Sequence, residues 1–521
     1  MKAIRLALLQ EQLEGVAEVM GEALARSAFS PNIRVRLDFS CALFSSAGEL
    51  LAQAAHIPVH LGSMPDQMKA LVRAYEVKPG DLFIANDPYE GGTHLPDITL
   101  IEPVFHDSGL CLGLVAARAH HADVGGQAPG SMASQPDIYG DGLRIPILRI
   151  AEDESWDRQI LKLLLANMRS PKDREGDLLA QQSACQQGCR GLQRVFAQWA
   201  KDDPSSWEQG LQELLETSRR GAQEYFAAFV SDRNEAFFQD FLELGSSLVP
   251  IKVRLSRSDD GRLVVNFHGT GAAVKSGFNA TLPVTKAAVC YVLRCLAPME
   301  LPLNQGFLDS FIVEAEEGSM VSAVYPQAVA AGNVETSQRL VDVVFGAFSE
   351  LIPDRVPAAS AGTMNNFSFG FSDPAFGVHY ETSGGGAGGC PGNKGAAQSG
   401  TQVHMTNTLS TPTEILEEEF PVSVGLHSFR EGSGGDGRYP GGRGFVKEVT
   451  FHAQARVSLM ATRRRTKPFG LKGGGDGAPG RQALRKQDGE WEPLEGTSSF
   501  MVEPGSTIRL ETPGGGAWGE K

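Results

Sequence analysis

The sequence lacks several features that define large classes of protein. No apolar run approaches the roughly 20 residues that a membrane-spanning helix needs. Basic residues are outnumbered, with 47 Lys and Arg against 62 Asp and Glu, and the net charge of −15 argues against nucleic acid or an anionic membrane as the main partner. Seven cysteines are scattered over 521 residues, and this odd number does not indicate a disulfide framework.

Two common catalytic signatures are also missing. There is no G-x-x-x-x-G-K-[ST] phosphate-binding loop. The stretches at 384–389 and 432–437 formally fit G-x-G-x-x-G, but neither opens a helix after a strand, so we interpret both as products of glycine richness. There is no G-x-S-x-G motif either. Cys390 with His404 offers a nucleophile and a base, but a structural thiol is the favoured interpretation.

The N-terminal segment predicts an amphipathic helix over residues 1–30. Its apolar residues recur at helical spacing, and four glutamates interrupt any run that would resemble the core of a secretory signal. These apolar residues are Leu6, Leu9, Leu13, Val16, Met20 and Leu24. We therefore expect a cytoplasmic protein that does not insert into a membrane.

The remaining pattern predicts an α+β fold of several lobes: an N-terminal sheet with helices, a helical insert, and a β-rich second half with glycine-rich loops. We place the boundaries at 1–150 for the first region, 151–245 for the insert, 246–445 for an α+β region and 446–521 for a β-rich end. Sixty glycines, roughly half again the usual share, gather mainly in the last third of the chain.

Individual segments sharpen this prediction. The alternation over 33–55 indicates two strands joined by a turn, and residues 60–77 indicate a helix with Ser63 as its N-cap. The apolar period over 206–244 predicts a continuous helix, and residues 334–353 predict another that ends at a proline.

One group of residues has the chemistry of a metal site. His94 and Asp97, in "NDPYEGGTHLPDITL" (86–100), flank a proline that excludes a helix interior and favours a bend. About two dozen residues later, "RAHHADVGG" offers His120 and His121, of which only one can face the same site on an extended strand. Asp38 lies on an early strand that can run beside them.

Two imidazoles with two carboxylates suit Zn²⁺, Mn²⁺ or Fe²⁺ better than Mg²⁺ or Ca²⁺. The alternative is that these histidines hold Gly/Pro turns through hydrogen bonds, as histidines in such loops often do. A second pair, His56 and His60, is separated by a proline, and we favour a structural or outer role around the site for both.

The chain resembles the hydantoinase B/oxoprolinase family. The matching stretches run from about residue 30 to residue 518. They are "NIRVRLDFSCALF", "HIPVHLGSM", "NDPYEGGTHLPDITLIEPVF", "RAHHADVGGQAPGSM", "LPLNQGF", "GNVETSQR", "HMTNT", "PGGRG", "KPFGL" and "TPGGGAWG".

This resemblance implies the B component of an ATP-dependent cyclic-amide hydrolase. An A-type partner subunit would use ATP to phosphorylate a ring such as 5-oxoproline or a hydantoin, and this chain would hydrolyse it with a divalent metal ion, so a hetero-oligomer is expected. The alternative is a component of a ketone carboxylase of the acetone or acetophenone carboxylase type. A third hypothesis is a non-catalytic scaffold, because Val35 stands where the family often has an acidic residue.

The resemblance also implies roles for single residues. Asp38, His94, Asp97 and His120 would be the metal ligands, while His121 and Asp123 would be outer groups or a proton acceptor. In "GNVETSQR", three polar residues are expected near substrate oxygens, although a helix N-terminus also favours such residues. They are Asn333, Thr336 and Arg339.

Overall fold

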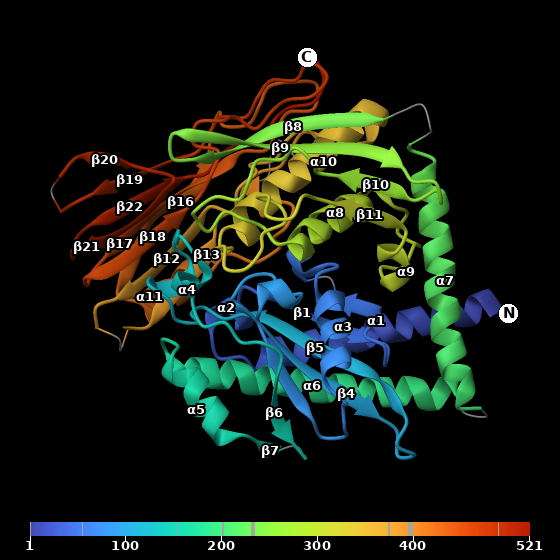
Figure 1. Ribbon diagram of the computed structural model, residues 1–521. Coiled ribbons are helices and arrows are strands. Elements are labelled where there is room, and N and C mark those ends of the chain that lie inside the picture. The colour runs from blue at the N-terminus through green and yellow to red at the C-terminus, as the bar shows by residue number, and fades with distance from the viewer. Residues whose placement is uncertain are drawn as a thin grey trace.

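The architecture is that of a multi-lobed α+β protein, as the sequence predicts (Figure 1). It is seen in a computed structural model that describes residues 2–54, 56–153, 155–200, 203–230, 235–373, 376–393, 400–487 and 489–521. In these residues no helix is both long enough and apolar enough to cross a membrane.

The N-terminal lobe is built on an antiparallel seven-stranded sheet. Its strands, in sheet order, are β2 (Leu50–Ala54), β1 (Phe39–Phe44), β5 (Cys111–His120), β4 (Asp97–Phe105), β3 (Leu82–Ala85), β6 (Leu148–Glu152) and β7 (Ser155–Trp156). Helices α1 (Lys2–Ser27) and α6 (Pro171–Trp199) cover one face, and α3 (Met64–Ala74) covers the other.

Because both faces of this sheet are covered, alternate residues of one strand enter two different cores. On β5, Val115, Ala117 and Ala119 join the core shared with α1 and α6. Leu114 and Ala116 join the core shared with α3. This alternation decides which side chains at the end of the strand can share a site.

A second lobe packs helices against a smaller sheet. The sheet has the order β11 (Phe311–Glu314), β10 (Leu263–Asn266), β9 (Ser247–Arg257) and β8 (Ala236–Leu244). Helix α10 (Ser337–Leu351) packs on β8, β9 and α8 (Leu282–Leu296), and the π-helical turn η4 (Gly332–Thr336) leads into it. This lobe brings residue 333 toward the N-terminal sheet.

The third lobe is a sandwich of two sheets. One sheet contains β13 (Val378–Thr382), β12 (Asn366–Phe371), β18 (Ala455–Met460) and β21 (Thr497–Val502). The other contains β16 (Val422–Arg430), β17 (Gly444–Phe451), β22 (Thr507–Glu511), β19 (Arg481–Arg485) and β20 (Trp491–Leu494). Aromatic and branched side chains of both sheets fill the space between them. A short pair, β14 (Gly385–Gly386) and β15 (Gly400–Thr401), lies in the glycine-rich loops.

Further helices connect these lobes. They are α2 (Pro31–Arg34), α4 (Ile138–Asp141), α5 (Arg158–Ala166), α7 (Ser205–Ala227), α9 (Gln305–Leu308) and α11 (Thr413–Glu419), with the single turns η1 (Pro58–His60), η2 (Pro88–Glu90), η3 (Pro129–Ser131) and η5 (Pro353–Arg355). In Figure 1, α7 stands beside the first two lobes and spans the height of both.

Three local predictions are wrong. The helix predicted over 206–244 ends at Ala227, and its last part is strand β8, which pairs with β9 through a hairpin at Gly245, a residue with φ +54°. Residues 33 and 34, the first of the predicted strand, belong instead to helix α2. Ser63 precedes α3, but its side chain donates to His60 O and does not cap the helix.

Candidate metal centre

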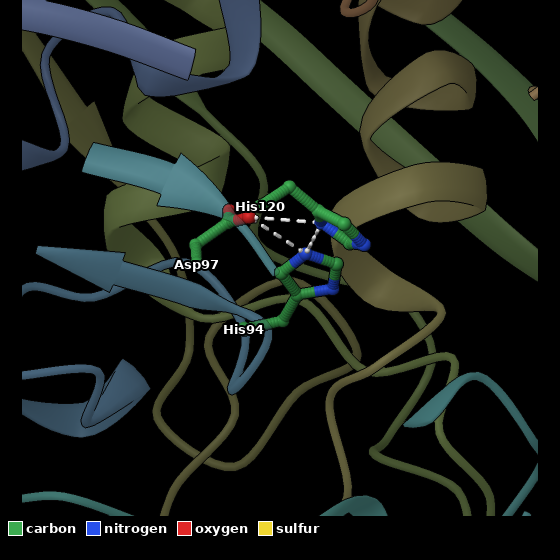
Figure 2. A group of neighbouring side chains, drawn as sticks. All are labelled: His94, Asp97 and His120. Carbon is green, nitrogen blue, oxygen red and sulfur yellow. Dashed lines mark hydrogen bonds and ion pairs between the residues drawn. The ribbon is translucent and has the colours of Figure 1, made fainter. Parts of the chain in front are cut away.

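Three side chains converge where β4 begins and β5 ends (Figure 2). Asp97 begins β4 and lies directly opposite His120, the last residue of β5, in the antiparallel register. His94 lies three residues before Asp97, where the Pro96 bend returns the chain toward the sheet; the Asp97 amide donates to His94 O. The bend and the strand register therefore bring residues 26 positions apart into one cluster.

The donor atoms of the cluster are close together. Asp97 Oδ1 lies 3.1 Å from His94 Nε2 and 3.0 Å from His120 Nδ1, and the two ring nitrogens are 3.1 Å apart. A tetrahedral Zn²⁺ with bonds of about 2.0–2.1 Å holds its ligand atoms roughly 3.3–3.4 Å apart, which is close to this spacing. The set of two imidazoles and one carboxylate therefore fits a borderline divalent ion.

Proton positions show what the three donor atoms need between them. His94 Nδ1 donates to Ala330 O at 3.2 Å, so in the neutral ring the lone pair is on Nε2. That lone pair faces Asp97 Oδ1, which also carries lone pairs, at 3.1 Å. A proton on His120 Nδ1, which lies 3.1 Å from His94 Nε2 and 3.0 Å from Asp97 Oδ1, or a metal ion in its place, relieves the repulsion between these two acceptors.

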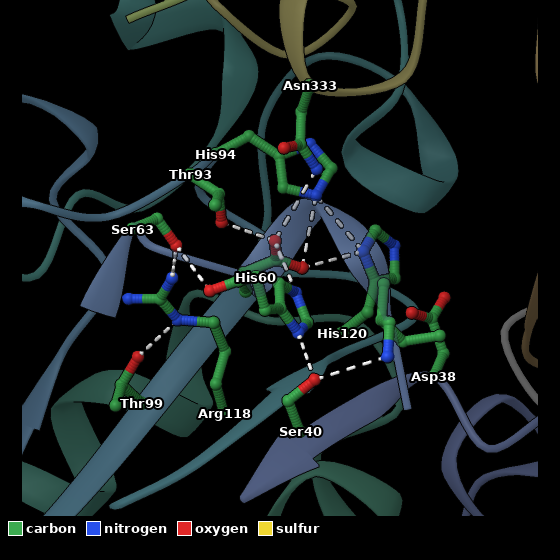
Figure 3. Close-up of polar contacts among 12 residues, drawn as sticks. Asp38, Ser40, His60, Ser63, Thr93, His94, Thr99, Arg118, His120 and Asn333 are labelled. Atoms are coloured by element: carbon green, nitrogen blue, oxygen red, sulfur yellow. Dashed lines mark hydrogen bonds and ion pairs between the residues drawn. The ribbon is translucent and has the colours of Figure 1, made fainter. Parts of the chain in front are cut away.

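The Asp97 carboxylate is also held from its other side, by Thr93, Asn333 and His60. Figure 3 shows these three partners. Asp97 Oδ2 accepts hydrogen bonds from Thr93 Oγ1 and, at 3.5 Å, from Asn333 Nδ2. His60 Nε2 lies 3.2 Å from the same oxygen, and His60 Nδ1 lies 2.9 Å from Ser40 Oγ. The outer role predicted for His60 agrees with this position.

Burial and charge act in opposite directions on these groups. Burial alone would raise the pKa of Asp97, but His94, His60 and the hydrogen bonds hold that pKa well below its usual range. Burial would lower the pKa of His94, but the Asp97 carboxylate raises it above its ordinary value. For His60, burial prevails and the pKa is lowered. The cluster thus keeps a charged carboxylate among imidazoles.

Asp38, the fourth predicted ligand, lies next to this cluster and outside its tight core. It immediately precedes β1, the neighbour of β5, and its carbonyl oxygen accepts the His120 amide at 3.0 Å. Its carboxylate is buried and accepts from Asn32 Nδ2 at 3.4 Å, while the same amide donates to His120 O at 2.7 Å. Figure 3 shows Asp38 on the outer side of His120.

The structure separates His121 and Asp123 from the cluster, so the catalytic roles expected for them do not fit. His121 faces the opposite side of the sheet, where its Nε2 lies 2.9 Å from Gln181 Oε1 of α6, and burial lowers its pKa to about 4. The Asp123 carboxylate accepts hydrogen bonds from the backbone amides of Gly125 and Gly130. It also forms an ion pair with Arg169, in which Oδ2 lies 3.0 Å from Arg169 Nη1. Strand alternation and turn formation account for these positions.

The three residues expected near substrate oxygens also divide. Asn333, on η4, reaches the cluster, and among the described residues its Oδ1 has no hydrogen-bond partner. Thr336 Oγ1 instead donates to Phe278 O, and the fully buried Arg339 donates to Phe241 O. Among the described residues, neither side chain has a hydrogen bond or ion pair with a cluster residue, and the Thr336 side chain does not cap α10. Val35 closes α2, its amide donating to Pro31 O.

Three further side chains at the centre were not predicted from sequence. Arg118 is fully buried and donates to Ser63 Oγ at 2.7 Å and to Thr99 Oγ1 at 2.9 Å; burial lowers its pKa to about 10. Its place two residues before His120 on one strand was a usable signal, since such residues share a face. Thr93 adjoins His94 in sequence. No feature of the sequence around Asn32 indicates that it lies at the centre.

Comparisons with known proteins identify the family of the chain. A model of the hydantoinase B/oxoprolinase family matches residues 2–521. 5-Oxoprolinase 1 of Arabidopsis thaliana is 37% identical over 99% of this chain, which spans 42% of that protein. A Pseudomonas sp. (strain NS671) protein, named provisionally as the B component of a D-/L-hydantoinase, is 27% identical over 97% of this chain and 88% of its own length.

Two solved structures share the fold. The ATP-dependent caprolactamase of Pseudomonas jessenii has a TM-score of 0.88 and 26% identity, covering 99% of this chain and 91% of that one. Nucleotide-free acetone carboxylase also has a TM-score of 0.88, with 19% identity over 99% of this chain and 76% of its own. The likeness to acetone carboxylase is one of fold alone. With the family match over nearly every residue, the chain belongs to the hydantoinase B/oxoprolinase family.

Proposed function

We propose that this chain is the ring-opening component of an ATP-dependent cyclic-amide hydrolase and acts on a lactam or imide that an A-type partner subunit has phosphorylated. The observation that carries this proposal is the convergence of His94, Asp97 and His120 into one buried cluster. The relatives named 5-oxoprolinase, hydantoinase and caprolactamase take their names from cyclic amides, and this supports the substrate class.

The division of labour follows from the chemistry. Amide resonance makes a ring carbonyl a poor electrophile, and transfer of a phosphoryl group to its oxygen makes the ring carbon electrophilic. After water adds to that carbon, the ring C–N bond would break with transfer of a proton to nitrogen. Hydrolysis of the resulting acyl phosphate would then leave a carboxylate and inorganic phosphate. The sequence has no P-loop for that transfer, which supports a separate ATP-using partner. The two chains together would form the working enzyme. This chain matches about two fifths of the length of the related 5-oxoprolinases. The remaining three fifths of those polypeptides are long enough to contain the ATP-using component.

His94, Asp97 and His120 would hold a Zn²⁺, Mn²⁺ or Fe²⁺ ion, with Asp38 as a further oxygen ligand from the adjacent strand. Such an ion makes water a stronger nucleophile near neutral pH. The Ala330 carbonyl and Asp97 orient the His94 ring, and Asn333 offers an amide oxygen to a polar group of the substrate. The three cluster residues are at most 3% exposed, so bulk water has little access to the cluster itself.

The test is reconstitution of the full chain with an A-type subunit, ATP and each of the three metals, using 5-oxoproline and hydantoin as substrates. We expect ring-opened product from the wild type and a loss of roughly 1,000-fold or more for His94→Ala. His106→Ala is the matched control, because His106 is exposed in the 106–109 turn and should retain full activity. Equal activity of His94→Ala and wild type would overturn the proposal. Incorporation of labelled bicarbonate would indicate the carboxylase alternative instead.

A further inference from the structure

The two histidines of the cluster are oriented in different ways. A metal-binding histidine usually donates its second ring N–H to an acceptor, and this hydrogen bond fixes the plane of the ring. His94 follows this rule, because its Nδ1 donates to Ala330 O at 3.2 Å. His120 does not: its Nδ1 faces the cluster, and its buried Nε2 has no hydrogen-bond partner among the residues that the structure describes.

An aromatic ring takes the place of that missing contact. Tyr380, on β13 of the third lobe, stacks on His120 with ring centroids 4.5 Å apart and an angle of 22° between the planes. Such a near-parallel contact restricts rotation of the imidazole about its side-chain bonds, and aromatic pairs contribute about 0.5–1.5 kcal/mol beyond their buried area.

Tyr380 is itself held firmly. Its hydroxyl donates to Asn366 Oδ1 at 2.9 Å, and its carbonyl oxygen accepts from Arg36 Nη1 at 3.0 Å. The same Arg36 guanidinium donates to Thr382 and Thr408 and lies 5.7 Å from the centroid of the Tyr380 ring. The tyrosine is buried, with 3% of its surface exposed. Its position is thus determined by β13 and Asn366 of the third lobe together with Arg36, which lies between α2 and β1 of the first lobe.

We infer that Tyr380 is a positioning residue of the metal centre: its ring sets the plane of His120 and so the direction in which His120 Nδ1 meets a bound ion. This inference rests on the proposed metal site. It goes beyond that proposal because it makes the third lobe, some 260 residues further along the chain, part of the apparatus that orients a ligand of the first lobe.

Two substitutions of Tyr380 distinguish the effect of its ring on metal binding from the effect of its hydroxyl. Tyr380→Leu removes the stacked ring, and we expect the affinity for Zn²⁺ or Co²⁺, measured by competition with a chelator, to fall about 10- to 100-fold, as is usual when an outer contact of a metal ligand is lost. Tyr380→Phe keeps the ring and should stay within about threefold of wild type. The visible absorption spectrum of the Co²⁺-saturated protein should change in Tyr380→Leu and not in Tyr380→Phe.

A matched control shows whether a change in metal binding arises from a general loss of packing in the third lobe. Phe369 on β12 packs its ring 4.9 Å from that of His379, which is not part of the cluster. Phe369→Leu should therefore lower the melting temperature without changing the Co²⁺ spectrum or the metal affinity.

The outcomes distinguish this inference from the proposed function. Wild-type protein that binds neither Zn²⁺ nor Co²⁺ would contradict both. Wild-type protein that binds them, together with unchanged affinity and spectrum in a folded Tyr380→Leu variant, would overturn the positioning role alone. Equal losses in Tyr380→Leu and Phe369→Leu would overturn it too, because both would then reflect packing.

Discussion

Two buried polar clusters of this molecule contain histidine and aspartate, but they differ in what neutralises the carboxylates. In the second cluster, Asp342 Oδ2 lies 3.3 Å from Arg463 Nη2, and the same Arg463 nitrogen lies 2.7 Å from Asp240. His404 Nε2 lies 2.9 Å from Asp342 Oδ1, and the buried Arg339 lies beside Asp240. We refer to these five residues as the Asp342 cluster.

At the candidate metal centre, by contrast, Asp97 lies beside three imidazoles, from His60, His94 and His120. An imidazole carries charge only when it is protonated, whereas a guanidinium is charged at every ordinary pH. The Asp342 cluster thus contains its own cations, and the Asp97 centre has ring nitrogens that a metal ion can bind. Because both clusters contain histidine and aspartate, their residue types alone would not show which one can bind a metal ion.

The largest expected effect is on metal affinity, which should depend on the Asp97 cluster and not on the Asp342 cluster. His94→Ala removes one of three converging ligand atoms, so we expect the affinity for Zn²⁺ or Mn²⁺ to fall by roughly 1,000-fold or more. His404→Ala removes the histidine of the Asp342 cluster and should leave affinity within about twofold. Elemental analysis after dialysis measures both. Metal retained by the first variant, or lost from the second, would remove the distinction between the clusters.

The second effect concerns stability. Asp342→Ala leaves the buried Arg463 with one carboxylate fewer, and the loss of one partner of a buried ion pair typically costs about 3–5 kcal/mol. Urea unfolding of the metal-free protein measures this free energy. If the structural assignment of the Asp342 cluster is wrong, the variant will unfold at the same urea concentration as wild type.

A smaller effect tests whether Asp38 belongs to the centre. Its carbonyl and Asn32 connect it to the His120 backbone, and its buried carboxylate, which immediately precedes β1, is the predicted fourth ligand. Asp38→Asn should reduce metal affinity about 10- to 100-fold, between the two histidine variants above. Titration against a fluorescent chelator measures this, and an unaltered affinity would place Asp38 outside the centre.

A pH dependence near the centre provides the last test. Asp141 accepts the amides of Val329 and Ala330, and burial raises its pKa from 3.8 to about 7. Between these values the unfolded chain has released the proton and the folded chain still holds it. Stability should therefore decline as the pH rises from about 4 to about 7, by roughly 4 kcal/mol for the full difference between the two pKa values.

Asp141→Asn keeps an oxygen for the two amides and cannot ionise, so it should flatten this decline. Thermal melting across that pH range compares the variant with wild type, and parallel curves for the two proteins would contradict the assignment to Asp141.

Much of the metal centre was accessible from sequence because its parts obey local rules. Pro96 forces the bend between His94 and Asp97, and strand alternation permits one histidine of the pair His120 and His121 on the site face. The α+β class and the lobed organisation were predictable from periodicity for the same reason. The family resemblance, and not the pattern, selected His120 over His121.

What could not be predicted depends on contacts between distant segments. Tyr380 reaches the centre from the third lobe and was not predicted. Asn333 was predicted together with Thr336 and Arg339, but no local pattern indicates that it alone of the three reaches Asp97. The failed helix over 236–244 has the same origin, because pairing with β9 overrides the helical period of that segment.

The depth of the cluster has one more consequence. Its three side chains are between 0% and 3% exposed, and they lie where the first lobe meets η4 of the second and β13 of the third. An ion held there exchanges with solution only when these lobes separate, so we expect the exchange to be slow. The metal present while the chain folds would then determine which metal the mature protein carries.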